Sequence, residues 1–146
     1  AIFINSSRGE VVVDDALKRY AGKLSGIILD VWDGEPELDL ELLSATDIAT
    51  PHIAGYSYEG KVNGTVMAVK ALGDFFGIEG LKCFSIVPAE KNNNFFSKGN
   101  LTQNQISEYF ENIFPIFEHC ADLKSNPQNF EQLRSNFKYR REFYVI

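Results

Sequence analysis

The stretch LSGIILDVW, residues 24–32, decides the fold class, because it is an almost unbroken apolar run that ends in an acid and a tryptophan. Such runs are typical of strands buried on both faces of a parallel sheet. Another apolar run, AIFI at residues 1–4, precedes it, and residues 13–23 predict a helix with Asp14 and Asp15 in its first turn. This β-α-β order predicts an α/β protein with a doubly wound parallel sheet.

Downstream of this run the pattern continues with further strands and helices. Residues 33–46 are a polar turn with a short helical piece, and residues 47–53, DIATPHI, predict a third short strand. Apolar residues then recur every three or four positions through residues 57–76, which predicts one long helix. Two further helices are predicted, at residues 101–124 with a break at the internal proline and at residues 126–143.

The composition changes after the long helix. Residues 85–100 are rich in asparagine, lysine and serine, which is typical of a linker or long loop. We therefore predict three parts: the second half of the sheet domain at residues 1–53, a connecting helix at 54–79, and a small α+β domain at 80–146. Because both ends of the sequence are apolar and strand-like, we also expect the chain to be a fragment of a longer protein.

The overall charge excludes some classes of protein. A formal net charge of −6 and an isoelectric point ≈ 4.9 disfavour a nucleic-acid surface, since phosphates require a basic patch. No window approaches the ~18 apolar residues of a membrane span. Cys83 and Cys120 lack the spacing of a metal site, so no metal is expected. We expect both to be reduced thiols in a cytoplasmic protein, with a disulfide between them as the alternative.

Three residues whose chemical roles complement one another are predicted at one edge of the sheet. Arg8, Glu35 and His52 each follow a predicted strand, and ligands of open parallel sheets bind outside the carboxyl ends of the strands. A guanidinium clamps a carboxylate, and an imidazole exchanges protons near neutral pH. A carboxylate behind the imidazole fixes its tautomer. Clamp, base and orienting acid are what an enzyme that oxidises a 2-hydroxy acid needs.

Each of these residues, taken singly, also has a structural interpretation. His52 alone is a satisfied surface or core histidine, Glu35 a turn acid, and Arg8 a surface arginine. The second histidine, His119, lies on a phenylalanine-rich helix face and is interpreted as structural. The tail contains three arginines, Arg134, Arg140 and Arg141. We interpret them as solvated or interfacial residues; the alternative is that they bind phosphate across a dimer.

Three sequence blocks carry a resemblance to a known family. NSSRGEVVVDDAL (5–17), ILDVWDGEP (28–36) and TPHIAG (50–55) resemble, in this order, signature blocks of the D-isomer-specific 2-hydroxyacid dehydrogenases. The resemblance implies a Rossmann-type domain with NAD as cofactor. Residues 37–43, 47–65 and 130–143 resemble a branch that acts on a phosphorylated 2-hydroxy acid and carries a C-terminal dimerisation domain.

The resemblance implies a role for each matching residue. Arg8 corresponds to the arginine that holds the substrate carboxylate, Glu35 to the acid paired with the catalytic histidine, and His52 to that histidine. Tyr56 corresponds to a tyrosine that contacts the substrate. The positions expected to contact NAD are Ser6, Ser7, Arg8, Asp30 and Gly55.

The glycine-rich dinucleotide fingerprint of the family has no match in this sequence; GIEGLK at 77–82 lacks its spacing. We therefore expect the intact protein to be active and this chain alone to be inactive. Aromatic residues in the tail predict a homodimer through residues 80–146, the alternative being that they pack against the sheet domain. Two other functions stay open: another family dehydrogenase, such as the 3-phosphoglycerate type, and a non-catalytic binding or assembly module.

Overall fold

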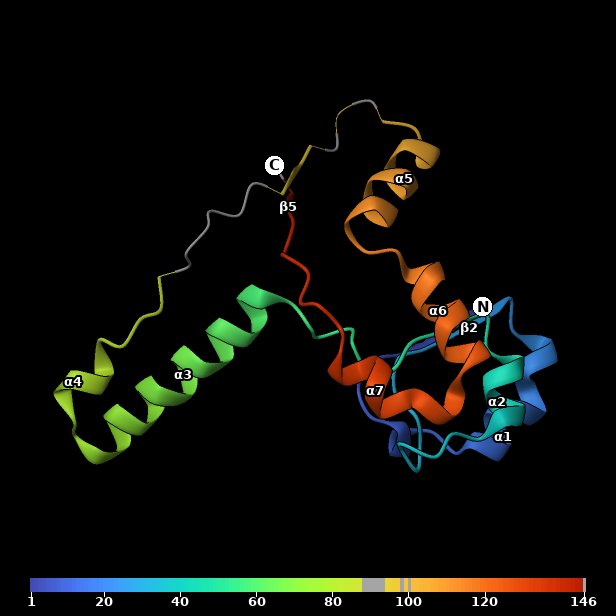
Figure 1. Cartoon of the computed structure of the whole chain (residues 1–146), viewed down its shortest axis with the longest axis horizontal. Coiled ribbons are helices and arrows are strands. Elements are labelled where there is room, and N and C mark those ends of the chain that lie inside the picture. The colour runs from blue at the N-terminus through green and yellow to red at the C-terminus, as the bar shows by residue number, and fades with distance from the viewer. Residues whose placement is uncertain (88–93, 98, 100, 146) are drawn as a thin grey trace. The chain divides into compact units, whose positions relative to one another are not determined.

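The computed structural model describes residues 1–87, 94–97, 99 and 101–145 (Figure 1). Two compact units are present, which we call the sheet unit (Ala1–Gly55 with Phe110–Lys138) and the α3 unit (Tyr56–Tyr109 with Tyr139–Ile146). Half of the predicted linker, residues 88–93, 98 and 100, lies outside the described residues. The three-part division predicted from the sequence stays a prediction about the intact protein.

The sheet unit is built on a three-stranded parallel sheet. Its strands are β1 (Ile2–Asn5), β2 (Gly26–Leu29) and β3 (Ile48–Ala49), in the spatial order β1-β2-β3. The central residue Leu29 is the register partner of Asn5 on one side and of Ala49 on the other. The predicted α/β class with parallel strands is therefore confirmed.

Two short helices connect the strands. Helix α1 (Asp14–Tyr20) links β1 to β2 and α2 (Leu40–Ala45) links β2 to β3, and the two helices lie side by side (Figure 1). Helix α2 begins where the Asp39 side chain accepts hydrogen bonds from two backbone N–H groups of its first turn. The same carboxylate accepts a 2.6 Å hydrogen bond from Lys18 of α1, which ties the two helices together.

Among the described residues, the helices cover one face of the sheet. Ile27 and Leu29 are 2% exposed and pack with apolar residues of α1 and α2. Ile2 and Ile4 point to the opposite face and are 62% and 63% exposed. Side chains alternate between the faces of a strand, so the helices that pack on Ile27 and Leu29 leave Ile2 and Ile4 exposed in the described structure.

Part of the tail packs on the sheet unit. Cys120 of α6 (Ile116–Ser125) accepts a 3.3 Å hydrogen bond from the Ala49 N–H at the free edge of β3, and Lys124 donates to the Thr46 carbonyl. Leu123 is fully buried. Since an unpaired strand edge presents backbone donors and acceptors, α6 satisfies groups that a further strand would otherwise pair.

The last predicted helix is shorter than expected. Residues 126–143 were predicted as one helix, but α7 covers only Phe130–Ser135, after a 3₁₀ turn at Pro127–Asn129. Asparagine and serine flank it, and these residues compete with helix formation through their side chains. The predicted break at Pro115 is confirmed, because it separates α6 from α5 (Gln103–Ile113).

The α3 unit contains the predicted long helix. Helix α3 runs Tyr58–Phe76, begins with Ser57 accepting a hydrogen bond from the Gly60 N–H, and ends at Gly77 with φ 67°. Helix α4 (Glu79–Lys82) packs back on it. A two-stranded parallel sheet, β4 (Phe95–Phe96) with β5 (Tyr144–Val145), completes the elements described in this unit.

Cys83 and Cys120 are both free thiols, so they do not form the disulfide that the sequence left open as an alternative.

Within the described part of the chain, no helix is both long and apolar enough to cross a membrane.

Candidate active site

Asp30, at the end of β2, holds together the loop that carries the predicted catalytic histidine. Its Oδ1 accepts hydrogen bonds from the Thr50 hydroxyl at 2.6 Å and the Ile53 N–H at 2.8 Å. Its Oδ2 accepts from the Ala54 N–H at 3.0 Å. Asp30 is only 5% exposed, so these bonds compensate for burying a carboxylate. The loop after β3 is thereby fixed to the carboxyl end of β2.

The backbone of His52 adopts an uncommon conformation. Its φ is 58°, and it is the one non-glycine residue of the described chain with positive φ. For an L-residue this region costs about 1–2 kcal/mol, and residues held there are often found at functional sites. The hydrogen bonds from the next two N–H groups, of Ile53 and Ala54, to Asp30 keep the turn in place.

Glu35 and His52 form the predicted pair. His52 Nδ1 lies 2.8 Å from Glu35 Oε2 and 3.2 Å from Oε1. Glu35 Oε1 also accepts a 3.0 Å hydrogen bond from the Trp32 N–H, which fixes the carboxylate. With Nδ1 donating to Glu35, Nε2 is the nitrogen that can exchange a proton with a substrate. The His52 side chain is 23% exposed and the Glu35 side chain 18%, so the pair is largely buried but still accessible to a small molecule.

The electrostatics of Asp30 differ from those of a surface acid. Burial raises the pKa of Asp30 above its usual value, and its hydrogen bonds and the nearby charge of His52 only reduce this rise. A raised pKa means that ionised Asp30 costs folding stability. An acid kept under these conditions is a functional candidate as well as a structural one.

Arg8 lies in the loop after β1, as expected, but does not join the pair. Its side chain is exposed and donates a 2.7 Å hydrogen bond to the Ser7 carbonyl. No hydrogen bond or ion pair within the described residues connects Arg8 to Glu35 or His52. Its neighbour Gly9 is packed so closely that an added Cβ would lie 2.1 Å from the Trp32 carbonyl carbon. The Arg8 loop is thus anchored against the strand end that carries Glu35.

The residues predicted to contact NAD lie on open surface or at the strand ends. Ser6, Ser7 and Gly55 are exposed, and a Cβ added to Gly55 would meet no heavy atom within 4 Å. Asp30 Oδ2 accepts one of the described hydrogen bonds, so a carboxylate lone pair is left for a further donor. These features fit the amide end of a nicotinamide cofactor. Tyr56 belongs to the α3 unit, where its ring packs edge-on against Tyr139.

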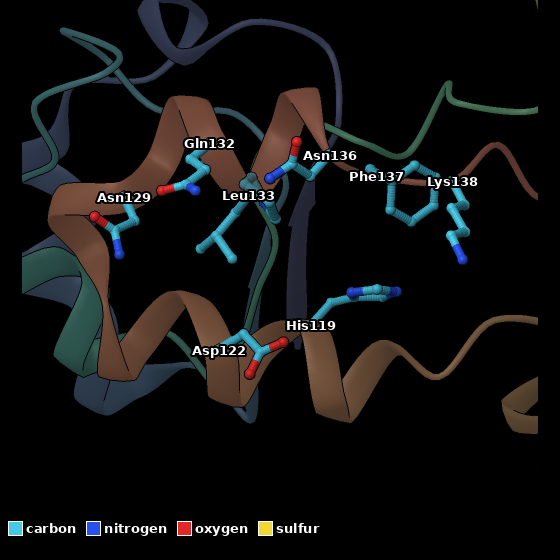
Figure 2. A pocket seen from close by; sticks show the side chains of 9 residues that line it. His119, Asp122, Asn129, Gln132, Leu133, Asn136, Phe137 and Lys138 are labelled. Carbon is cyan, nitrogen blue, oxygen red and sulfur yellow. The ribbon is translucent and has the colours of Figure 1, made fainter.

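A pocket of ≈ 560 Å³ lies between α6 and α7 of the sheet unit. Figure 2 shows His119 and Asp122 of α6 facing Asn129 of the 3₁₀ turn, Gln132 of α7 and Asn136, which follows α7. Pro51 lines this pocket, whereas neither Glu35 nor His52 does. The ring of His119 also packs against Phe114 and Phe137, in agreement with its predicted structural role. No cluster that could hold a metal ion exists among the described residues.

One residue near the pair was missed by the sequence interpretation. Arg134 of α7 was interpreted as solvated or interfacial, but its Nη1 lies 3.8 Å from Glu35 Oε2. No sequence motif indicates that Arg134 lies near Glu35, because this contact depends on how the tail packs on the sheet unit.

Comparison with known proteins agrees with this geometry. The sequence model described as "D-isomer specific 2-hydroxyacid dehydrogenase, NAD binding domain" matches residues 1–54, the segment that carries Asp30, Glu35 and His52. Residues 1–54 are thus similar to the NAD-binding domain of this dehydrogenase family. NAD is the cofactor that the description of the matching model names.

Curated relatives extend the similarity to the whole chain. An erythronate-4-phosphate dehydrogenase of Bacteroides fragilis is 43% identical over 97% of this chain and 39% of its own length. Enzymes of the same name from Teredinibacter turnerae and Escherichia coli are 38% identical over 98% and 100% of the chain, and each is covered over 41% of its length. The chain thus spans about two fifths of the dehydrogenases that it matches.

Proposed function

We propose that the full-length protein carrying this chain is an NAD-dependent dehydrogenase that oxidises 4-phospho-D-erythronate to the corresponding 2-oxo acid, a step in pyridoxal 5'-phosphate biosynthesis. The observation that carries the proposal is the Glu35–His52 pair, 2.8 Å apart at the carboxyl edge of the sheet. The substrate is proposed from the names of the relatives that resemble the whole chain.

The residues of the pair divide the work of moving a proton. His52 Nε2 accepts the proton of the substrate hydroxyl while its Nδ1–H remains hydrogen-bonded to Glu35. The Glu35 carboxylate stabilises the imidazolium that forms, and its hydrogen bond from the Trp32 N–H keeps it oriented. When bound, NAD supplies the acceptor for the hydride that leaves the same carbon.

Arg8 and the neighbouring loop residues hold the reactants in this proposal. Arg8 is exposed and turns from the Ser7 carbonyl to clamp the substrate carboxylate through paired hydrogen bonds. Asp30, Ser6, Ser7 and Gly55 bind the nicotinamide end of NAD. Tyr56 contacts the substrate.

The test uses the purified full-length protein with NAD and three acids: 4-phospho-D-erythronate, D-erythronate without the phosphate, and 3-phospho-D-glycerate. Formation of NADH with the first acid only is expected. Preference for 3-phospho-D-glycerate would assign the protein to the other dehydrogenase type, and inactivity with all three would favour a non-catalytic module.

The His52→Ala variant tests the role of the pair. Turnover should fall by roughly 10²–10⁴, since general acid–base catalysis contributes about that factor, while NAD affinity persists. His119, the other histidine of the chain, supplies the control: a folded His119→Gln variant should retain turnover. Normal turnover with lost NAD affinity in His52→Ala would show that the role is wrongly assigned.

We also propose a cytoplasmic homodimer that associates through residues 80–146. Exposed aromatic side chains support the interface: Phe117 is 62% and Tyr139 51% exposed, and aromatic residues are enriched at interface centres. The two free cysteines support the compartment.

Sedimentation of the full-length protein tests the dimer. Phe117→Ser should lower the fraction of dimer, whereas Phe75→Ser, an 82% exposed control outside the predicted interface, should not. Phe114 is left intact because it packs against Phe137 within the chain. An unchanged dimer mass in folded Phe117→Ser would remove this part of the surface from the interface.

A further inference from the structure

Arg134 forms a long ion pair with the same carboxylate oxygen that contacts His52. Its Nη1 lies 3.8 Å from Glu35 Oε2, and His52 Nδ1 lies 2.8 Å from that oxygen. Glu35 therefore stands between two groups that each carry a positive charge when His52 is protonated. Arg134 is 35% exposed on its side chain and Glu35 18%, so solvent screens this ion pair only in part.

The packing of α7 holds Arg134 at this position. Phe130, one helical turn earlier, is 1% exposed and belongs to the core of the sheet unit together with Leu123 of α6. Side chains four residues apart lie on one face of a helix, so burying Phe130 directs Arg134 toward the same side. Arg134 thus reaches Glu35 from a well-anchored element.

Two carboxylates lie close to the His52 ring. Glu35 contacts the ring directly, and the buried Asp30 carboxylate interacts with the charge of His52 from the end of β2. Arg8 follows β1 but is turned to the Ser7 carbonyl. Oxidation of a hydroxyl requires the neutral ring as base. Arg134 places a positive charge 3.8 Å from Glu35 Oε2, opposite in sign to the two carboxylates.

We propose that Arg134 is a positioning residue of the acid/base pair. It keeps the Glu35 carboxylate oriented toward His52 and offsets part of its negative charge, so that neutral His52 is available at lower pH. This inference rests on the proposed function, because it concerns the same pair. It adds to that function a residue from the tail, outside residues 1–54 that match the dehydrogenase family.

Removing the charge should move the acidic limb of the pH–rate profile. In the full-length protein, Arg134→Gln should shift the acidic limb of kcat/KM upward by about half a pH unit, the size expected for one partly screened charge nearby. Arg134→Lys keeps the positive charge, so its acidic limb should lie close to that of the wild type. Lys138→Gln removes another exposed positive charge of the tail, which forms no ion pair with Glu35 among the described residues, and should leave the profile in place.

A second measurement does not depend on turnover. The histidine ring protons of the full-length protein, with the His52 signal assigned by its loss in His52→Ala, are titrated by NMR without substrate. The midpoint for His52 should be higher in Arg134→Gln than in the wild type and Arg134→Lys. The folded state of each variant is checked by circular dichroism.

The outcomes separate this inference from the proposed function. Failure of the wild type to oxidise 4-phospho-D-erythronate contradicts the proposed function, while the NMR titration still tests Arg134. A raised KM for the substrate with an unchanged pH profile and an unchanged His52 midpoint would show that Arg134 binds substrate directly, and would overturn the inference. An unchanged profile, midpoint and KM would overturn it as well.

Discussion

Substituting Asp30 by asparagine should destabilise the loop that carries His52. Asparagine keeps an oxygen for the Thr50 hydroxyl and the Ile53 N–H, but it places an NH₂ group against the Ala54 N–H, which lies 3.0 Å from Oδ2. A buried donor left without an acceptor costs about 1–3 kcal/mol. We expect Asp30→Asn to lower the free energy of unfolding by about 1–3 kcal/mol at low pH. The loss should be smaller near neutral pH, because the variant no longer buries a charge.

The loss should depend on pH with a defined sign. Burial raises the pKa of Asp30 in the folded state above the ordinary value of 3.8. The contribution of Asp30 to the free energy of unfolding is therefore fully present below the pKa that Asp30 has in the unfolded chain. This contribution is lost as pH rises through the pKa of Asp30 in the folded state. The asparagine variant lacks this titration. The stability difference between wild type and Asp30→Asn should thus be largest at low pH, decrease as pH rises, and then become constant.

Urea unfolding of this chain from pH 4 to 8 measures both effects, with the fluorescence of Trp32 as signal. Trp32 is the single tryptophan of the chain, is 4% exposed, and donates a 3.0 Å hydrogen bond to the Thr50 carbonyl beside Asp30. The exposed Asp33→Asn is the matched control and should change stability by no more than about 0.5 kcal/mol. A stability difference that widens with rising pH would refute the raised pKa and the reasoning built on it.

Two further substitutions test the packing around the site. Gly9→Ala should cost about 3 kcal/mol or more and lower kcat/KM of the full-length protein, because the added Cβ would lie 2.1 Å from the Trp32 backbone. Gly22→Ala, whose Cβ would meet nothing within 4 Å, should be nearly neutral, and equal melting temperatures for the two would contradict the close approach. Leu123→Ala should cost about 2–5 kcal/mol, since this side chain is 0% exposed. Phe117 is 62% exposed, so Phe117→Ala should change the free energy of unfolding by no more than about 0.5 kcal/mol. Similar urea midpoints for Leu123→Ala and Phe117→Ala would mean that α6 does not pack on the sheet.

Local patterns were sufficient to predict most elements of this chain. The apolar run that contains β2 (Gly26–Leu29), the helical repeat of α3 (Tyr58–Phe76) and the break at Pro115 are set by neighbours within a few residues. The approach of Glu35 and His52 was also predictable, because the carboxyl ends of parallel strands meet at one edge.

Contacts between distant parts of the chain required the tertiary structure. The helix predicted to continue beyond Ser135 ends there, and residues after it bind to the start of α3 through Glu59 instead. Likewise, Arg8 turns to its own loop rather than to the catalytic pair. These outcomes depend on competition among hydrogen-bonding partners, which a local sequence pattern does not rank.

For this protein, the sequence alone determined the strand-helix order, the Glu35–His52 pair and the resemblance to 2-hydroxyacid dehydrogenases. Only the tertiary structure revealed that α6 caps the edge of β3, that Asp30 holds the His52 turn at φ 58°, and that Arg134 reaches Glu35. The physical reason is the range of the interactions. Periodicity and turn chemistry act over a few residues, whereas packing brings together side chains about 100 residues apart in sequence, and their energies depend on burial and distance in three dimensions.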